Sequence, residues 1–488
     1  MKNLKSCIFL ILMAQLFLHN AVSKAETSHI PFTLTKDTNF WQESTNYPGV
    51  LKGIEIKNTF PEKQWWLEFN DPVLNCYIEQ AISANQDLKI ALDRIEEANA
   101  QTGVVFGKEF PQITIRDYYF RTKGSKTFLV PNASQSSLQS SSFLAGGSQN
   151  LYILPLIAQY ELDYLGKNHS KTKAARKAEE ASKYNYKTVM ITIAANVATA
   201  YLNLLQADKL LKLQCALLQN QEKSLELRQS QFNEGLVSLD DVLINQEAIS
   251  AIKSNISNIK KTQGLLVHQL SILMGKPPTV EACLKRSDID CISVNKDIQI
   301  GDPCSLIVRR PDILASEAQL EAAGINVSVA RKDLFPSISA IGSFGYASAF
   351  LDKFFNWESN TTAIGSGISQ ALFTGGTKIA TVKLNKAQYK EALHNYERTV
   401  LNAFKDVEDS LSLLNSSLIQ YLQSEEDVTN SEHQLVLTTD RYREGINSCL
   451  DVLTSEQQLL NFKQNLVERK SEILIDNISL YKALGGGF

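Results

Sequence analysis

Residues 231–243 read QFNEGLVSLDDVL, and 210 positions further on residues 441–453 read RYREGINSCLDVL. Both copies contain Glu-Gly, then Ser, then Asp-Val-Leu. A glycine can end a helix in the left-handed conformation, and a serine shortly after it can cap the next helix. The sequence therefore predicts a tandem repeat in which each half contains a helix, a tight turn and a returning helix.

The helices that lead into these turns are predicted to be long. The 65 residues from 168 to 232 contain no proline or glycine, and as one helix they would measure ~98 Å. A second such run extends from 377 to 444. From Val400 to Tyr421 the apolar residues follow 4-3 spacing, which is the pattern of a coiled-coil seam. We therefore expect two long, coiled-coil-like helical hairpins.

Short segments of strand character lie between the helices. In one of them Leu156 and Ala158 alternate with Ile157 and Gln159, as in a barrel strand with an apolar outer face. Four strands cannot close on themselves, and lipid does not tolerate an open edge. Because ~8 strands make only the narrowest barrel, a barrel shared by three chains is favoured over one shared by two. The four predicted strands are 112–121, 151–164, 337–347 and 362–373.

The N-terminus has the features of a secretory signal peptide. Two lysines precede an apolar segment at 7–17, and small residues at 23–25 provide a cleavage site. We expect the mature chain to begin at Glu26. A lipid anchor would need a cysteine just after the cleavage site, whereas Cys7 lies far before it. We therefore expect no lipidation.

Composition excludes several classes of function. Beyond the signal no stretch approaches the ~18 consecutive apolar residues of a membrane helix, so a membrane-spanning part must be built of strands. Removing residues 1–25 takes away three lysines and lowers the formal net charge from −3 to −6, which does not favour nucleic acid. There is no GxxxxGK phosphate loop, and the histidines are too scattered for a catalytic triad or a metal site. We expect no enzyme, no cofactor and no metal.

Six cysteines remain in the mature chain, and none of them forms a CxxC pair. Cys283, Cys291 and Cys304 lie within one segment. A local disulfide and buried free thiols are both consistent with this spacing, and the choice between them stays open.

Five motifs resemble those of the TolC-type outer-membrane efflux channels, and in particular the NodT-like branch that serves resistance-nodulation-division pumps. The resemblance covers nearly all of the mature chain. It implies a homotrimer that is mainly α with a small β part: an α-barrel of helical hairpins, and four strands per chain in a shared twelve-stranded transmembrane β-barrel. The motifs are WWLEFNDP at 65–72, YELDYLG at 160–166, RRPDI at 309–313, FPSIS at 335–339 and LFTGG at 372–376.

The resemblance also implies a function. The chain would be the outer-membrane exit duct of a tripartite efflux pump in a Gram-negative bacterium, a passive conduit for small molecules that is gated at its periplasmic tip. Its partners would be two further copies of itself, a periplasmic adaptor (membrane fusion) protein, an inner-membrane transporter and outer-membrane lipid. Two alternatives stay open: the duct of a type I protein secretion system, and a non-conducting coiled-coil stalk or adhesin.

Candidate gate residues follow from the same resemblance. In the family, acidic residues just past the second turn ring the closed entrance, and Asp451 stands at the first of these positions while Thr454 stands at the second. Tyr442 matches an aromatic residue that ties the closed gate, whereas Asn447 stands where some relatives carry a basic residue. Asp241 is the counterpart of Asp451 in the repeat. The alternative for both aspartates is the solvated first turn of a helix, where acids complement the dipole.

Other motif residues have simpler interpretations. The turn residues Gly235, Ser238, Gly445 and Ser448 are predicted to shape the turns, and the resemblance adds contact with an adaptor as a second role. Residues 309–312, Arg-Arg-Pro-Asp, predict a helix start with proline in the first turn.

The tryptophans divide into two groups. Trp65 and Trp66 are expected to pack against the helices, because they lie far from any predicted strand. Trp357 is a candidate anchor at a membrane interface.

These expectations divide the chain into six segments. They are a signal peptide at 1–25, an N-terminal periplasmic segment at 26–74, a first repeat at 75–275, a linker at 276–310, a second repeat at 311–485 and a tail at 486–488.

Overall fold

The computed structural model describes residues 55–57, 64–123, 148–278, 284–294, 297–299 and 303–486. The chain divides into two compact units, Met1–Asn39 and Phe40–Phe488, and all described residues lie in the second. The predicted signal peptide, the predicted start at Glu26 and the side chains of Cys283 and Cys304 lie outside the described residues.

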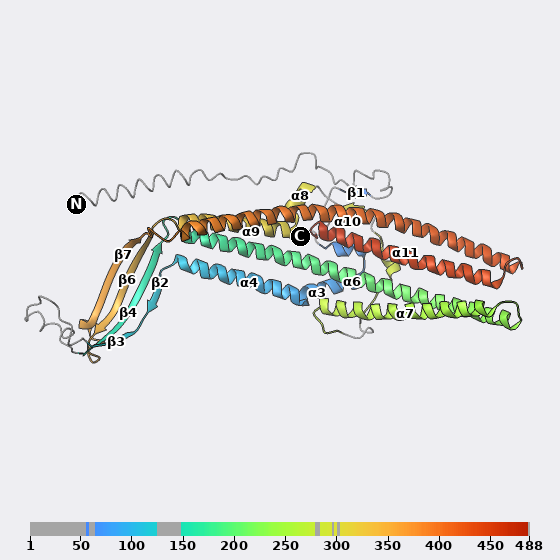
Figure 1. The fold of residues 1–488 in the computed structure, drawn as a ribbon, viewed down its shortest axis with the longest axis horizontal. Coiled ribbons are helices and arrows are strands. Elements are labelled where there is room, and N and C mark those ends of the chain that lie inside the picture. Colours follow the sequence, from blue (N-terminus) through green and yellow to red (C-terminus); the bar gives the residue numbers. More distant parts are fainter. Residues whose placement is uncertain are drawn as a thin grey trace, which may run out of the picture. The chain divides into compact units, whose positions relative to one another are not determined.

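Two helical hairpins make up most of the second unit, with the strands at one end of the long helices and the hairpin turns at the other (Figure 1). Helices α6 (Lys167–Asn233) and α10 (Thr377–Arg443) have 67 residues each. The returning helices α7 (Leu239–Leu273) and α11 (Cys449–Ala483) have 35 residues each. The equal lengths confirm the internal repeat. The shorter helices are α3 (Pro72–Ala84), α4 (Gln86–Phe106), α8 (Pro303–Arg309) and α9 (Pro311–Lys332).

Helix α6 lies at the centre of the packing, since it contacts α4, α7, α9 and α11. Its middle, from Ile193 to Leu205, is buried in one apolar cluster. A second cluster includes Val400 and Leu418, so the predicted coiled-coil seam is buried. Among the described residues, neither cluster includes an α6 residue beyond Leu205 or an α10 residue beyond Leu418. The two large apolar clusters therefore end well before the hairpin turns, and only scattered buried apolar residues, such as Val242 and Leu453, continue towards them.

The segment before the first helix packs against this core. Trp65 and Trp66 are 0% and 3% exposed, and the Trp65 ring stacks on Tyr481 with centroids 5.4 Å apart. Asp71 caps α3 by accepting from the Val73 N–H at 2.8 Å, and its other oxygen accepts from the Tyr201 hydroxyl at 2.9 Å. The predicted packing of both tryptophans against the helices is confirmed.

Among the described residues the sheet contains five strands, because the single strand predicted at 112–121 is divided in two. β2 (Gln112–Ile115) and β3 (Tyr118–Lys123) replace the single strand predicted at 112–121. Both pair antiparallel with β4 (Ser148–Leu162) in one continuous register. The break between β2 and β3 lies opposite Pro155 of β4, which has no N–H to donate. The Arg116 N–H still donates to the Pro155 carbonyl at 3.2 Å. β2 and β3 thus occupy one strand position.

The sheet order is β2-β4-β6-β7, with β2 and β7 at the edges. β4 (Ser148–Leu162), β6 (Ser337–Ser348) and β7 (Asn360–Ser369) are antiparallel neighbours. Residues 370–373, predicted as the end of the last strand, lie outside β7.

The pairing register places apolar side chains on one face of the sheet, because paired residues share a face. Ile113 pairs with Ala158, which pairs with Gly342, which pairs with Ile364. The same face carries Leu156 and Phe344, whereas the opposite face combines small and polar residues with Ile157, which pairs with Thr114 and Ser343. The contrast is clearest on β7, where Ile364 and Ile368 lie on the first face and Ala363 and Gly365 on the other. We call the first face the apolar face.

Two further observations complete the fold. A parallel pair of short strands joins β1 (Glu55–Lys57) to β5 (Asp297–Gln299). Among the described helices, α6 is long and apolar enough to cross a membrane, but 61% of its most apolar window is buried inside the protein, as expected for a core helix.

Candidate functional site at the hairpin turns

Both hairpin turns have the same backbone geometry. Gly235 and Gly445 have φ of 75° and 77°, in the left-handed region that favours glycine. The Gly235 N–H donates to the Phe232 carbonyl at 2.9 Å, and the next N–H donates to the Gln231 carbonyl at 2.8 Å. The second turn repeats both bonds, at 3.0 and 2.8 Å. This is the Schellman motif that the repeated Glu-Gly predicted.

A capping box begins each returning helix. The Ser448 N–H donates to Asp451 Oδ2 at 2.8 Å, and the Asp451 N–H donates to Ser448 Oγ at 3.2 Å. The first turn repeats this with Ser238 and Asp241, at 3.1 and 3.3 Å. Both aspartates therefore stabilise a helix start, as the alternative interpretation required.

Hydrogen bonding in the capping boxes affects the charge of both aspartates. The Ser448 N–H and hydroxyl lower the pKa of Asp451 below its ordinary value. The Ser238 hydroxyl and N–H do the same for the pKa of Asp241. Asp451 is exposed and Asp241 is half-buried, and because the pKa of each is lowered, both carboxylates stay ionised at neutral pH.

The other predicted gate residues lie close to the second turn. Thr454 is exposed, and its hydroxyl donates to the Leu450 carbonyl at 2.8 Å. It lies three positions after Asp451, so both side chains lie on one face of α11. Tyr442 lies in the last turn of α10 and is 45% exposed. Within the described part of the chain, no hydrogen bond joins Tyr442 to Asp451 or Thr454.

Apolar side chains are exposed at both turns. Leu236 and Ile446 immediately follow the two glycines and are 74% and 69% exposed. Leu239, in the first turn of α7, is 54% exposed. Matching apolar tips of this kind are suited to contact with another protein.

The packing between α10 and α11 has a feature that the sequence analysis missed. Buried small hydroxyl residues recur every seven positions along α10, although the corresponding positions of α6 carry mostly alanine and glutamine. Several of the hydroxyls donate to their own helix, as Ser424 does to the Gln420 carbonyl at 2.8 Å. The part of the second hairpin that buries these hydroxyl residues therefore gains little stability from apolar burial at those positions. The series is Ser410, Ser417, Ser424, Ser431 and Thr438.

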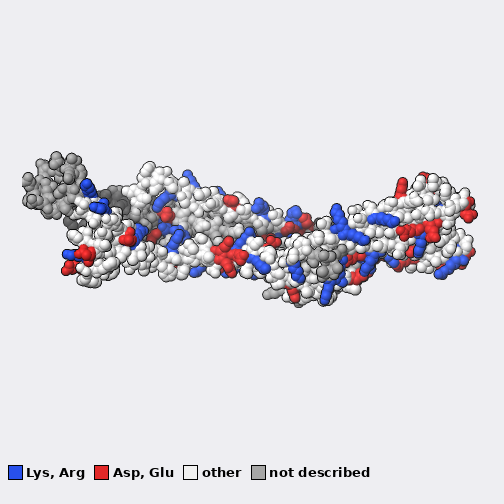
Figure 2. All heavy atoms as spheres, turned by 90° about the horizontal axis from the view of Figure 1, so that it is seen from below, with Lys and Arg blue, Asp and Glu red and all other residues white. Residues whose placement is uncertain are grey.

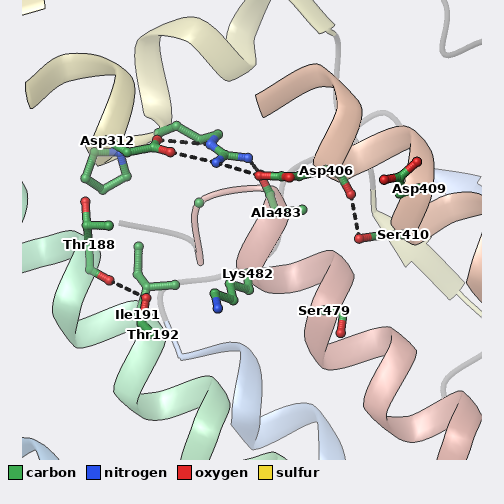
Figure 3. Close-up of a pocket in the computed structure, with 13 residues that line it drawn as sticks. Thr188, Ile191, Thr192, Asp312, Asp406, Asp409, Ser410, Ser479, Lys482 and Ala483 are labelled. Carbon is green, nitrogen blue, oxygen red and sulfur yellow. Dashed lines mark hydrogen bonds and ion pairs between the residues drawn. The ribbon is translucent and has the colours of Figure 1, made fainter. Parts of the chain in front are cut away.

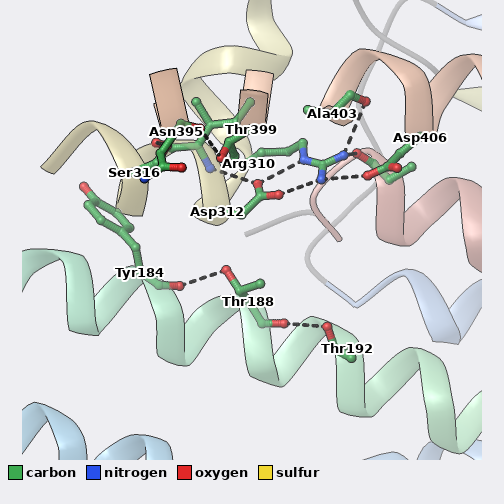
Figure 4. Close-up of polar contacts among 12 residues, drawn as sticks. Tyr184, Thr188, Thr192, Arg310, Asp312, Ser316, Asn395, Thr399, Ala403 and Asp406 are labelled. Atoms are coloured by element: carbon green, nitrogen blue, oxygen red, sulfur yellow. Dashed lines mark hydrogen bonds and ion pairs between the residues drawn. The ribbon is translucent and has the colours of Figure 1, made fainter. Parts of the chain in front are cut away.

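A second cluster that the sequence analysis missed surrounds Arg310, which is only 8% exposed. Its guanidinium donates to Asp312 at 3.0 and 2.6 Å and to Asp406 at 3.1 Å (Figure 4). It also donates to the Ala483 carbonyl at 2.9 Å. One side chain thus joins the start of α9, the middle of α10 and the end of α11. The prediction of a helix start is confirmed by Pro311 at N1, but it is incomplete.

A cavity of about 410 Å³ opens beside this cluster. Asp406, Asp409 and Lys482 line it together with hydroxyl groups of α6, including that of Thr188 (Figure 3). Among the described residues, no group of three or more metal-ligating side chains occurs here or elsewhere.

The thiols that the structure describes are free. Cys76, Cys215 and Cys291 are exposed, and Cys449 is half-buried at the start of α11. The interpretation of Cys291 as a buried thiol or a disulfide partner is therefore wrong.

A repeated helical hairpin that carries a small sheet at its far end defines a class of outer-membrane channel proteins. Residues 77–276 and 303–486 match the family described as Outer membrane efflux protein, and the chain belongs to this family.

Individual relatives agree with this assignment. The solvent efflux pump outer membrane protein SrpC of Pseudomonas putida is 28% identical over 451 residues, which cover 92% of each chain. The cation efflux system protein CusC of Escherichia coli is 27% identical over 438 residues, covering 89% of this chain and 90% of CusC. The probable outer membrane lipoprotein SilC of Salmonella typhimurium is 29% identical over 441 residues, covering 88% and 89%.

Solved structures show the same fold. The outer-membrane channel OprN has a TM-score of 0.79 at 26% identity, and the match covers 90% of this chain and 96% of OprN. The outer membrane protein VceC of Vibrio cholerae has a TM-score of 0.76 at 25% identity, covering 88% of this chain and 100% of VceC.

Proposed function

We propose that this chain is one protomer of a homotrimeric outer-membrane channel, the passive exit duct of a tripartite efflux pump. The observation that carries this proposal is a sheet with two open edges and one exposed apolar face. Ile364 and Ile368 on that face are 90% and 74% exposed, and Ile115 is 67% exposed. Water disfavours such a surface, whereas lipid accommodates it.

The number of copies is inferred from the open edges of the sheet. Within the described part of the chain no strand pairs with the outer edges of β2 and β7, and lipid cannot satisfy unpaired backbone groups. The sheet has four strand positions, so three copies would supply twelve strands and pair every edge. A stalk or adhesin would have no use for an apolar sheet face, and the relatives SrpC and CusC are named for solvent and cation efflux and not for protein secretion.

The remaining partners follow from the hairpin end. The exposed apolar residues Leu236 and Ile446 offer a surface to a periplasmic adaptor, which would connect the channel to an inner-membrane transporter. The glycines and serines of the turns hold that surface in place. On the face shown in Figure 2, acidic and basic side chains alternate along the helices, which does not favour nucleic acid.

The gate is proposed at the second turn. Three copies of Asp451 around an axis would form an acidic ring that attracts cations, with Thr454 beside it and Tyr442 at the end of α10. Among the described residues, the hydrogen bonds to the Asp451 carboxylate all use Oδ2. One oxygen therefore remains to face the pore. Asp241 would contribute in the same way from the first turn.

One pair of substitutions tests the channel. Ile364→Arg should prevent assembly in the outer membrane, because a charge on the lipid-facing side costs about 2–4 kcal/mol at the bilayer midplane. Ala363→Arg lies on the opposite face and should leave a heat-modifiable trimer that conducts, with ion selectivity shifted towards anions. The measurements are gel mobility of outer-membrane fractions and planar-bilayer conductance. A wild-type trimer that does not conduct would contradict the proposed function.

We also propose that the chain is not lipidated, although SilC is named a lipoprotein. The intact mass of the purified protein should equal that of residues 26–488 without addition. A mass increase that corresponds to acyl chains on a cysteine would reject this prediction. No enzymatic activity is proposed, and no cofactor.

A further inference from the structure

The end of the sheet far from the helices carries a row of aromatic rings. Tyr119 and Tyr152 have ring centroids 5.0 Å apart, and Phe354 lies 6.1 Å from Tyr152 and 6.4 Å from Tyr346. Phe355 continues the row at 4.9 Å from Phe354. We call these five residues the aromatic row. The register places its three tyrosines on the apolar face of the sheet.

The loop between β6 and β7, residues 349–359, folds onto this face. Within the loop, Phe354 is 7% exposed and packs near Tyr152 and Tyr346, whereas Phe355 and Trp357 are 71% and 76% exposed. The loop is held by its own hydrogen bonds, since Lys353 O accepts from the Asn356 N–H at 3.1 Å and from the Ser359 hydroxyl at 2.9 Å. These bonds shape the backbone of 353–359, which carries the exposed rings of Phe355 and Trp357.

Cationic side chains flank the aromatic row. Arg121 and Lys123 follow Tyr119 on β3 and lie on the same face, paired with Asn150 and Ser148. Lys353 immediately precedes Phe354. All three cations are exposed, and no ion pair within the described residues engages them. The acidic groups of the same loop are Asp352 and Glu358, so the local charge is positive by one.

Along the strands the apolar face thus ends in aromatic rings, and the rings are followed by cations. We propose that this end of the sheet binds a phosphorylated, multi-acylated glycolipid of the outer leaflet. Its acyl chains lie along Leu156 and Ile364, its sugar rings pack against the aromatic row and Trp357, and its phosphates bind Arg121, Lys123 and Lys353. A phospholipid would match the apolar and cationic parts but has no sugar to occupy the rings. The proposal rests on the membrane placement proposed above.

The test compares lipids and variants in the detergent-solubilised full-length trimer. Bis-phosphorylated lipid A should raise the melting temperature of the wild type. The triple variant Arg121→Ala, Lys123→Ala, Lys353→Ala should need at least tenfold more lipid for the same shift. Dephosphorylated lipid A and phosphatidylglycerol should each be at least tenfold weaker than lipid A on the wild type. Lys223→Ala, Lys260→Ala and Lys261→Ala together remove the same charge from exposed helical positions and should behave as the wild type.

Several results would overturn the site. They are an unchanged response of the triple variant, equal binding of dephosphorylated lipid A, and equal binding of phosphatidylglycerol. The last would assign the surface to anionic lipid in general. Planar-bilayer conductance separates this proposal from the channel function, because the triple variant should still conduct. Failure of the wild type to conduct would reject the channel and not the lipid site.

Discussion

Asp451→Asn should abolish the sensitivity of the channel to divalent cations. The amide keeps an oxygen that can accept from Ser448, so the helix cap is retained while the charge is lost. In the proposed ring, three carboxylates would repel one another and favour an open entrance in the absence of cations, and a bound cation would neutralise them and block it. In planar bilayers we expect the concentration of divalent cation that halves the wild-type current to rise at least tenfold in the variant, and the open time to increase in its presence.

Matched variants separate the charge from the cap. Ser448→Ala removes the cap but keeps the carboxylate, so the cation block should persist. Asp241→Asn makes the same change at the first turn and should have the smaller effect, because the resemblance places the acidic ring past the second turn. A cation block of unchanged strength in Asp451→Asn would remove Asp451 from the gate.

The pH dependence of the block has a definite sign. Hydrogen bonds from Ser448 lower the pKa of Asp451 in the single chain, whereas repulsion among three carboxylates in the proposed ring would raise it. In either case the block requires the charged form, so it should be present at neutral pH and be lost as the pH falls and the carboxylates are protonated. Loss of the block near neutral pH would indicate a different titrating group.

Arg310→Ala should cause the largest loss of stability among single substitutions in the second repeat. It leaves the half-buried carboxylate of Asp312 without its ion-pair partner and removes the contact to the Ala483 carbonyl. Breaking a fully buried ion pair by removing one partner costs about 3–5 kcal/mol, and the partial exposure of Asp312 and Asp406 places this variant towards the lower end of that range. The free energy of unfolding of the detergent-solubilised protein, measured with urea, should fall by about this amount.

Controls distinguish this role from a general effect of charge. Arg309→Ala removes the same charge from a half-buried neighbouring position and should cost much less. Arg310→Lys should recover little, since lysine cannot donate in bidentate fashion to Asp312. Asp406→Asn should be milder than Arg310→Ala, because the Asp406 side chain is 48% exposed. Equal stability of Arg310→Ala and the wild type would contradict this account.

The sequence carried enough information for the hairpins and for both turns. Glycine in the left-handed conformation and serine at an N-cap are local requirements, so the repeated motif predicted them without knowledge of the tertiary fold. The apolar face of the sheet was predictable for the same reason, since alternation along one strand needs no partner.

The features that the sequence analysis missed all depend on long-range placement. The break opposite Pro155 can be predicted only when the register between β2 and β4 is known. The role of Arg310 can be predicted only when Asp406 and Ala483, which are 96 and 173 positions away, are known to lie next to it. The buried serines of α10 resemble a solvated face until α11 is placed against them. The Arg-Arg-Pro-Asp sequence at 309–312 is the local signal for the arginine cluster, but the same residues also predict a helix start.

The main apolar cluster of the second hairpin ends at Leu418, about 25 residues before α10 ends, and Val428 is the one apolar residue that the described part of α10 buries beyond it. At 1.5 Å per residue, this part of the helix is a lever of ~38 Å, and a tilt of about 5° about Leu418 would displace its tip by ~3 Å. Such a movement would disturb few buried apolar contacts. A partner that holds only the tips could therefore widen the passage with little work against the fold, and the strands in the membrane would not need to move.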